Sequence, residues 1–269
     1  MLRGLLVSRA TIADINPEVF WPCRTWTQFA ALPDKERRAV ILPFFGIADW
    51  GIGHPMDVEE ILGTAILNAA FAHSTSERLE IVAPPVRFVP APFANQAFGL
   101  DSDTVYQHAH ELLESIQASG FTRVILFNTS PWGETFIDVT GRDTRIQLGL
   151  QLFCINLSGL GLDLNPGLRQ EPGLRARLKA QTLATYLLEK EPVFEADPTF
   201  AAIPVDASSG ELQPHGPLLT DFASLATART EGPRLLKTVG AELAGLLDEI
   251  AARPPLPDNG RWPRKTRYP

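Results

Sequence analysis

The sequence of 269 residues predicts an α/β protein, a three-layer α/β/α sandwich with a mainly parallel central sheet. Short, continuous apolar runs, which are typical of strands buried on both faces of a parallel sheet, recur along the chain. Segments with apolar residues at helical spacing alternate with these runs. The resulting β-α-β-α-β-α-β order indicates a layered sheet with helices on both faces.

The first half of the pattern contains two strands and two helices. The run at 37–46 predicts a buried strand, and 57–74 predicts a helix with acids in its first turn, where the helix dipole favours them. Residues 79–88 predict a second strand that ends at prolines. Residues 101–120 predict a helix that begins on capping side chains and ends at a glycine.

The second half continues the alternation. Residues 121–130 give the clearest buried strand, 132–149 a helix and 150–162 a fourth strand. Residues 174–192 predict another helix, and 221–253 an amphipathic helix near the end of the chain. The predicted elements therefore supply one sheet and its covering helices.

The chain shows no internal repeat and no clean linker, so we expect a single domain over 1–269 with its core at about 25–250. Residues 193–220 form a long irregular insertion that is expected to cover a site or an oligomer contact. A proline-rich tail follows at 253–269.

Composition limits the possible partners. A net charge of −7 argues against nucleic acid, because nucleic-acid binding needs a concentrated positive surface. The two cysteines form no ligand spacing and no disulfide framework, which favours a reducing cytoplasm. No window approaches the roughly 20 apolar residues of a membrane helix, and no signal peptide is expected.

The segment 42–60 joins a buried strand to glycines, a histidine and several acids, a costly grouping unless something binds there. Two interpretations stay open. One is a mononuclear metal site of Asp49, His54, Asp57 and Glu60. The other is a solvated helix N-terminus that contains Asp57, Glu59 and Glu60, with His54 as a turn residue hydrogen-bonded to backbone.

Three patterns resemble the creatininase (creatinine amidohydrolase) family. Residues 39–66, AVILPFFGIADWGIGHPMDVEEILGTAI, are similar to its L-P-x-G-S-x-E-x-H-G-x-H-L-P-x-x-x-D segment. Residues 112–134, LLESIQASGFTRVILFNTSPWGE, are similar to its G-F-x-R strand followed by N-G-H-G-G-N. Residues 220–250 resemble its closing segment and C-terminal helix. The resemblance implies the family's fold and a homo-oligomer, with a hexamer as one form.

In that family two divalent metals are held by a Glu, a His and an Asp of the first motif, and by a His and a later acid of the second. The resemblance places the first Glu on Asp49 and the first His on Gly51. The second His coincides with His54, and the final Asp falls on Glu60.

In the second motif the Asn coincides with Asn128, and the His falls on Ser130. The position of the later acid is Trp132, and Glu134 lies close by. The family's H-A-G-E-x-E-T-S stretch falls on 178–185, which contains neither the His nor the acids.

These replacements change the expected chemistry. A pair of hydrolytic metal ions needs about five or six protein ligands. We therefore expect at most one weakly held divalent metal, on Asp49 and Glu60, and the sequence leaves the identity of any other cofactor open.

Two functions remain open. The first is a hydrolase that acts on a C–N bond, amide or cyclic amide, of a small molecule through a mononuclear or metal-free site. The second is a catalytically inactive subunit that binds a small molecule or forms a complex. The residues expected to carry the chemistry are Asp49, His54, Glu60, Ser130 and Glu134, and those expected to contact the substrate are Trp50, Asn128 and Trp132.

Overall fold

The computed structural model describes residues 11–48, 50, 54–73, 80–90, 99–165, 168, 170–191 and 223–256. Four features expected from the sequence lie outside the described residues: Asp49, Gly51, the insertion at 193–220 and the tail from 257 onward. No helix among the described ranges combines the length and apolar character needed to cross a membrane.

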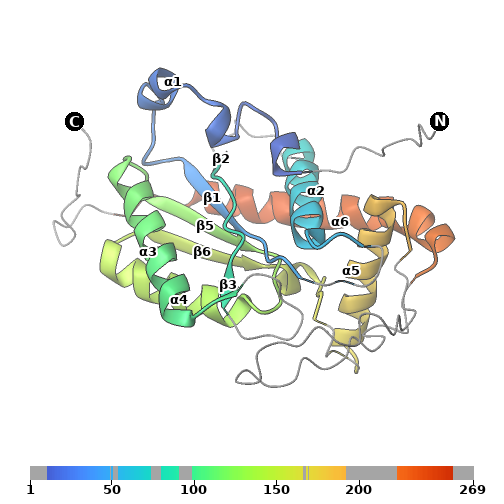
Figure 1. Ribbon diagram of the computed structural model, residues 1–269. Coiled ribbons are helices and arrows are strands. Elements are labelled where there is room, and N and C mark those ends of the chain that lie inside the picture. The colour runs from blue at the N-terminus through green and yellow to red at the C-terminus, as the bar shows by residue number, and fades with distance from the viewer. Residues whose placement is uncertain are drawn as a thin grey trace, which may run out of the picture.

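The central sheet has four parallel strands in the order β2-β1-β5-β6 (Figure 1). They are β1 (Ala39–Phe44), β2 (Glu80–Val82), β5 (Arg123–Asn128) and β6 (Gln151–Asn156). Phe44, Asn128 and Asn156 are in register, so β1, β5 and β6 end at the same level. The parallel sheet confirms the fold class that the sequence predicts. Two short strands, β3 (Val89–Pro90) and β4 (Gly99–Leu100), form a separate pair.

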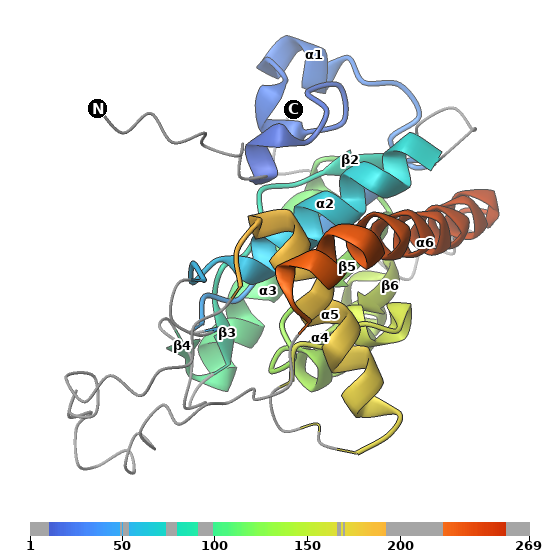
Figure 2. The ribbon, with the colours of Figure 1, turned by 90° about the vertical axis from the view of Figure 1, so that its right-hand side faces the viewer.

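Helices cover both faces of the sheet (Figures 1 and 2). One layer holds α2 (Val58–His73), α5 (Gly173–Leu188) and α6 (Leu225–Ala252), and the other holds α3 (Ser102–Ala118) and α4 (Glu134–Leu148). The strand residues alternate between the layers: Ile41 and Ile125 pack with the first, and Val40 and Val124 with the second. Because both faces are buried, the strands read as continuous apolar runs.

Two expected strands are shorter than predicted. Within the segment 79–88 the strand β2 covers only 80–82, because the prolines that follow lack the amide that a ladder requires. Val86 then makes one isolated parallel bridge with Phe44. The segment 150–162 ends as a strand at Asn156 and continues as η3 (Leu157–Leu160). Gly161 completes that turn with a φ of 69°, a conformation that glycine adopts without strain. Ahead of the sheet lie η1 (Ile12–Asp14), η2 (Trp21–Cys23) and α1 (Trp26–Ala30).

The end of α6 is fastened to the sheet by the buried side chain of Arg123, which is 1% exposed. Its guanidinium donates to the carbonyl oxygens of Ala251 and Arg253 at 3.3 and 2.5 Å, and to that of Arg37 at 3.2 Å. It also donates to Gln151 Oε1 at 3.0 Å. A single cation thus joins the starts of β5 and β6 to the carbonyl end of α6, where the helix dipole favours positive charge.

Helices α2 and α6 approach closely at Gly240. Both figures show the two helices side by side (Figure 2). A Cβ at Gly240 would lie 2.5 Å from Ala69 Cβ and 3.0 Å from the Ala69 carbonyl carbon. At Gly245, five residues later in the same helix, an added Cβ would meet nothing within 4 Å. A substitution at Gly245 therefore tests helix propensity alone, whereas the same substitution at Gly240 also tests the packing of α6 against α2.

Replacing each glycine with alanine is expected to have opposite effects on the free energy of unfolding. Gly240→Ala should lower it by about 1–3 kcal/mol, because α2 must move away. Gly245→Ala should raise it by up to about 1 kcal/mol, because alanine favours a helix. Urea unfolding followed by circular dichroism measures both. Equal effects would contradict the close packing of α2 on α6.

Candidate functional site

The carboxyl ends of β1 and β5 meet the first turn of α2 at the buried side chain of Glu59. Its Oε2 accepts a hydrogen bond from the Gly46 amide, and its main-chain oxygen accepts one from Thr129 Oγ1 at 3.0 Å. Burial raises the pKa of the Glu59 carboxyl to about 8, although Gly46 and the Ser130 hydroxyl partly offset the rise. The carboxyl is therefore largely protonated at neutral pH.

The Ser130 hydroxyl lies beside this carboxyl, at the position expected for a nucleophile. Neither Ser130 Oγ nor Glu59 Oε1 meets the geometry of a hydrogen bond with any described group. The Asn128 side chain holds the Ser130 backbone: its Nδ2 donates to Ser130 O at 2.9 Å, and its Oδ1 accepts from Ser130 N at 3.1 Å. Nδ2 also donates to Asn156 Oδ1 at 3.0 Å, so the Asn128 amide ties the ends of β5 and β6 together.

Glu60 points away from Glu59, into an ion pair with Arg87. The guanidinium donates through Nε at 2.7 Å and through Nη2 at 3.0 Å, a bidentate arrangement. Glu60 Oε1 also accepts from the Ile12 amide at 3.3 Å. Both acids are buried, so the interpretation of this turn as a solvated N-terminus is wrong for Glu59 and Glu60.

The two tryptophans expected to contact substrate lie against each other. The Trp50 and Trp132 rings stack with centroids 5.3 Å apart and an interplanar angle of 28°. Trp50 is buried and Trp132 is half-buried. The structure therefore brings together an aromatic pair at the strand ends, as the carried-over positions imply.

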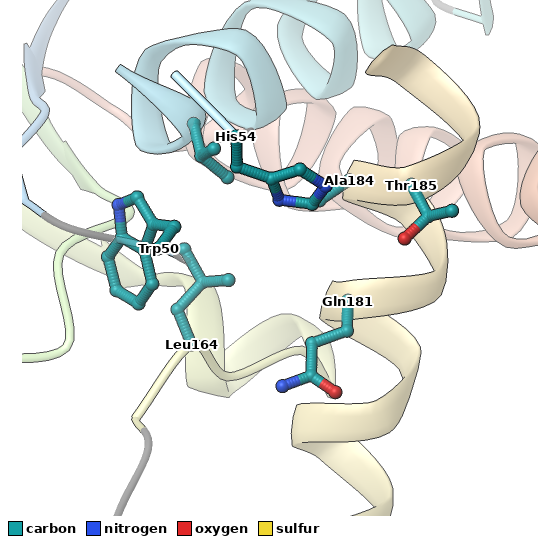
Figure 3. A pocket seen from close by; sticks show the side chains of 7 residues that line it. Trp50, His54, Leu164, Gln181, Ala184 and Thr185 are labelled. Carbon is teal, nitrogen blue, oxygen red and sulfur yellow. The ribbon is translucent and has the colours of Figure 1, made fainter. Parts of the chain in front are cut away.

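His54 lies at a small cavity between this region and α5 (Figure 3). Its Nε2 is 3.0 Å from the Lys190 carbonyl oxygen, which can only accept, so Nε2 carries the proton. Burial lowers the pKa of the His54 imidazole and favours the neutral ring. In this tautomer Nδ1 is a hydrogen-bond acceptor.

The cavity has a volume of about 20 Å³, which is room for about one water-sized group. Its walls come from Trp50, His54, Val58, Leu164, Gln181, Ala184 and Thr185. Gln181 and Thr185 project from successive turns of α5 (Figure 3), and neither Gln181 Oε1 nor Thr185 Oγ1 has a hydrogen-bond partner among the described residues. A polar group of a ligand would satisfy these atoms.

Glu134 begins α4 and faces a different set of groups. Burial raises the pKa of the Glu134 carboxyl, and the nearby negative charge of Asp163 raises that pKa further. A hydrogen bond from Ser158 partly offsets the rise. Across the ranges that the structure describes, no hydrogen bond or ion pair joins any two of His54, Glu60, Ser130 and Glu134. These four candidate residues therefore do not form one hydrogen-bonded catalytic group.

Sequence reasoning missed Glu59, Gln181 and Thr185. Glu59 is one of several acids in a predicted helical turn, and spacing alone does not show which acid turns inward. The segment that contains Gln181 and Thr185 lacks the acids and histidine of the family stretch, so the resemblance gives it no role. Their four-residue spacing on a predicted helix, which places them on one face, was the available signal.

The structure defines a parallel α/β/α sandwich with polar groups and indoles at the carboxyl ends of its strands, the edge at which open α/β sheets in general bind ligands. Among solved structures its fold is that of creatininase. The chain resembles a creatinine amidohydrolase (creatininase) at a TM-score of 0.62 and 17% identity, covering 88% of this chain and 99% of that one. A candidate creatinine amidohydrolase from Bacteroides fragilis gives 0.62 and 16%, with coverage of 90% and 100%.

A creatininase variant complexed with creatine also matches, at a TM-score of 0.62 and 18% identity over 87% of this chain and 99% of that one. No protein-family model and no curated protein sequence gives a significant match. The structural likeness confirms the creatininase fold that the sequence motifs imply, at 16–19% identity in the compared structures.

Creatininase structures include a manganese form and a variant of the Zn–Zn type, so a metal pair is the group that the fold implies. The described residues do not fit one. Glu60 is held by Arg87, and the Glu59 carboxyl favours its protonated form. Among the described residues, which exclude Asp49, no three His, Cys, Asp or Glu side chains gather in a group that could hold a metal ion.

Proposed function

We propose that this protein is a divergent member of the creatininase family that binds a small molecule bearing N–H groups at the carboxyl ends of its strands, without the family's two-metal chemistry. The observation that carries the proposal is the cavity at His54, where buried polar atoms of α5 have no partner among the described residues.

The hydrogen-bonding character of the cavity favours a donor group. The neutral His54 ring presents Nδ1 as an acceptor, Gln181 Oε1 is an acceptor, and the Thr185 hydroxyl acts in either direction. A buried acceptor left unpaired costs about 1–3 kcal/mol, which a ligand N–H group would recover. Guanidine and amide groups both carry such N–H donors.

The compared structures support this ligand class. One is a creatinine amidohydrolase, and another is complexed with creatine, a molecule with a guanidine group. The cavity of about 20 Å³ fits only the end of such a molecule, so the rest of the ligand would extend toward the stacked indoles or solvent.

Titration calorimetry with creatinine and with creatine tests this proposal. We expect at least one of them to bind, and Thr185→Val and Gln181→Leu each to weaken binding by about tenfold or more, because each removes a buried polar partner. Thr238→Val, the same change on α6, is the matched control and should leave binding unchanged. Absence of binding by both compounds, or equal binding by all variants, would count against the site.

Hydrolysis of a C–N bond in the bound molecule is a second candidate. One observation favours it: the Glu59 carboxyl titrates near neutral pH beside the Ser130 hydroxyl, as suits a general acid or base. The expected catalytic roles of Asp49, His54, Glu60, Ser130 and Glu134 belong to this candidate. If it holds, Glu59→Gln lowers creatinine turnover by about 10²-fold or more without changing creatinine binding. No turnover by the wild-type protein would remove this candidate while leaving the binding proposal intact.

The expected metal content separates this proposal from the ordinary family mechanism. We expect fewer than one tightly held transition-metal ion per chain, and a divalent ion on Asp49 and Glu60 would have to displace the Arg87 guanidinium from Glu60. Elemental analysis of the purified protein measures this directly. Two tightly held ions per chain would overturn the proposal. A cytoplasmic location and a homo-oligomeric state, with a hexamer as the form that the family resemblance implies, are further parts of it.

A further inference from the structure

Strand β6 ends the sheet with an edge that is suited to pairing. Figure 1 shows β6 as the outermost strand beside α4, and no described strand pairs with its outer side. The Gln151 amide donates inward to Thr122 O. Because amides along a strand alternate in direction, those of Leu152 and Cys154 face the outer edge. The strand, QLFCIN, contains none of the Pro, Lys or Arg residues that natural proteins use to block an exposed edge.

The start of this strand lies in a broad apolar groove. The groove has a volume of about 510 Å³ and runs between the end of α4, the first half of β6 and the chain that leaves α6. Ile146 is 62% exposed and Leu256 is 42% exposed on its walls, and Phe153 is half-buried there. Exposed apolar side chains beside an open strand edge are typical of a contact surface.

The two ends of the edge carry opposite charges. Asp138 of α4 accepts a hydrogen bond from Asn156 Nδ2 at 3.3 Å, which places its carboxylate at the carboxyl end of β6. Arg145, two helical turns later, and Arg253 line the groove at the other end, near Gln151. If a second β6 strand lies antiparallel to the first, the acidic end of each strand therefore lies beside the basic end of the other.

From these features we infer that a second copy of this chain docks along β6, with the two β6 strands antiparallel across a two-fold axis. The main-chain groups of both edges pair, and the two sheets become continuous. Asp138 of each copy then faces Arg145 of the other, because both side chains come from α4 on one face of the continuous sheet, and the apolar grooves cover each other. An unrelated strand-forming peptide would lack this reciprocal match of charges.

Charge reversal distinguishes this arrangement from other modes of association. Asp138→Arg and Arg145→Asp, made singly, each place like charges together at both ends of the shared edge, and should raise the dissociation constant about tenfold or more. The double variant, Asp138→Arg with Arg145→Asp, restores opposite charges and should restore association. Sedimentation velocity over a range of protein concentrations measures all three.

The wild-type protein is expected to sediment as a dimer of the 29.5 kDa chain or as an even multiple of it, and the single variants at half that mass. Glu242→Arg, an exposed acid on α6 in the opposite layer, is the matched control and should not change the mass. Thermal unfolding by circular dichroism checks that each variant folds. A monomeric wild-type protein, or a double variant that dissociates further than either single one, would overturn the inference.

Discussion

Arg123→Met is expected to lower the free energy of unfolding by about 3 kcal/mol or more. The substitution keeps an apolar stem of similar length but removes the donors that satisfy Arg37 O, Ala251 O and Arg253 O. These carbonyl groups then lose a charged partner at a place where water has poor access. Burial lowers the pKa of Arg123, but a guanidinium keeps its charge in a protein. The contacts that disappear are therefore charge-assisted hydrogen bonds.

Urea unfolding at neutral pH, followed by tryptophan fluorescence and circular dichroism, provides the measurement. Arg142→Met on the exposed face of α4 is the matched control, with an expected change within about 0.5 kcal/mol. Hydrogen exchange adds a local test: the last turn of α6 should lose protection first in the Arg123 variant. Equal stability of the two variants would show that the contacts at the end of α6 contribute little.

Glu59→Gln is expected to remove a large part of the pH dependence of stability. The folded protein holds the Glu59 proton up to about pH 8, whereas an unperturbed carboxyl releases it near pH 4.5. Between these values the folded state binds more protons than the unfolded state, so stability falls as pH rises, by at most about 1.4 kcal/mol per pH unit. The contribution is fully present below pH 4.5 and is lost as pH rises through about 8.

Glutamine keeps the size of the side chain and an oxygen that can accept from Gly46, but it cannot ionise. The variant should therefore be more stable than the wild type above pH 8, and the difference should shrink as pH falls toward 4.5. Urea unfolding at intervals between these values measures the difference. Glu242→Gln, at an exposed site on α6, is the control. Parallel curves for the wild type and Glu59→Gln would mean that Glu59 is ionised in the folded protein.

Much of the sheet could be predicted from sequence, because its strands are buried on both faces. The runs around Ile41 and Ile125 lack polar interruptions, and runs of that length are typical of strands within a covered parallel sheet. The helices at 58–73 and 102–118 were likewise set by periodicity and by end residues such as Asp101, whose side chain accepts from the Thr104 amide. Strand ends were predicted less well, because Asn156 and the glycines after it depend on nonlocal contacts.

For the candidate site, the sequence indicates which polar and aromatic residues follow the strands but not which groups they contact. Two metal positions of the family fall on Ser130 and Trp132, and Trp50 lies between two others; the two indoles stack at the strand ends. Glu60 was expected as a ligand, yet the ion pair with Arg87 occupies it. Arg87 lies 27 residues away in sequence, so no local pattern shows that pairing.

By itself the sequence determined the α/β class, the parallel strands and the absence of imidazole at Gly51 and Ser130, because these follow from local apolar runs and residue identity. Tertiary structure alone decided which acid of α2 turns inward. Neighbouring helical residues differ by about 100° in direction, so a rotation fixed by distant packing sends Glu59 to Gly46 and Glu60 to Arg87. Burial then sets the charge of each carboxyl, which depends on surroundings that a sequence does not display.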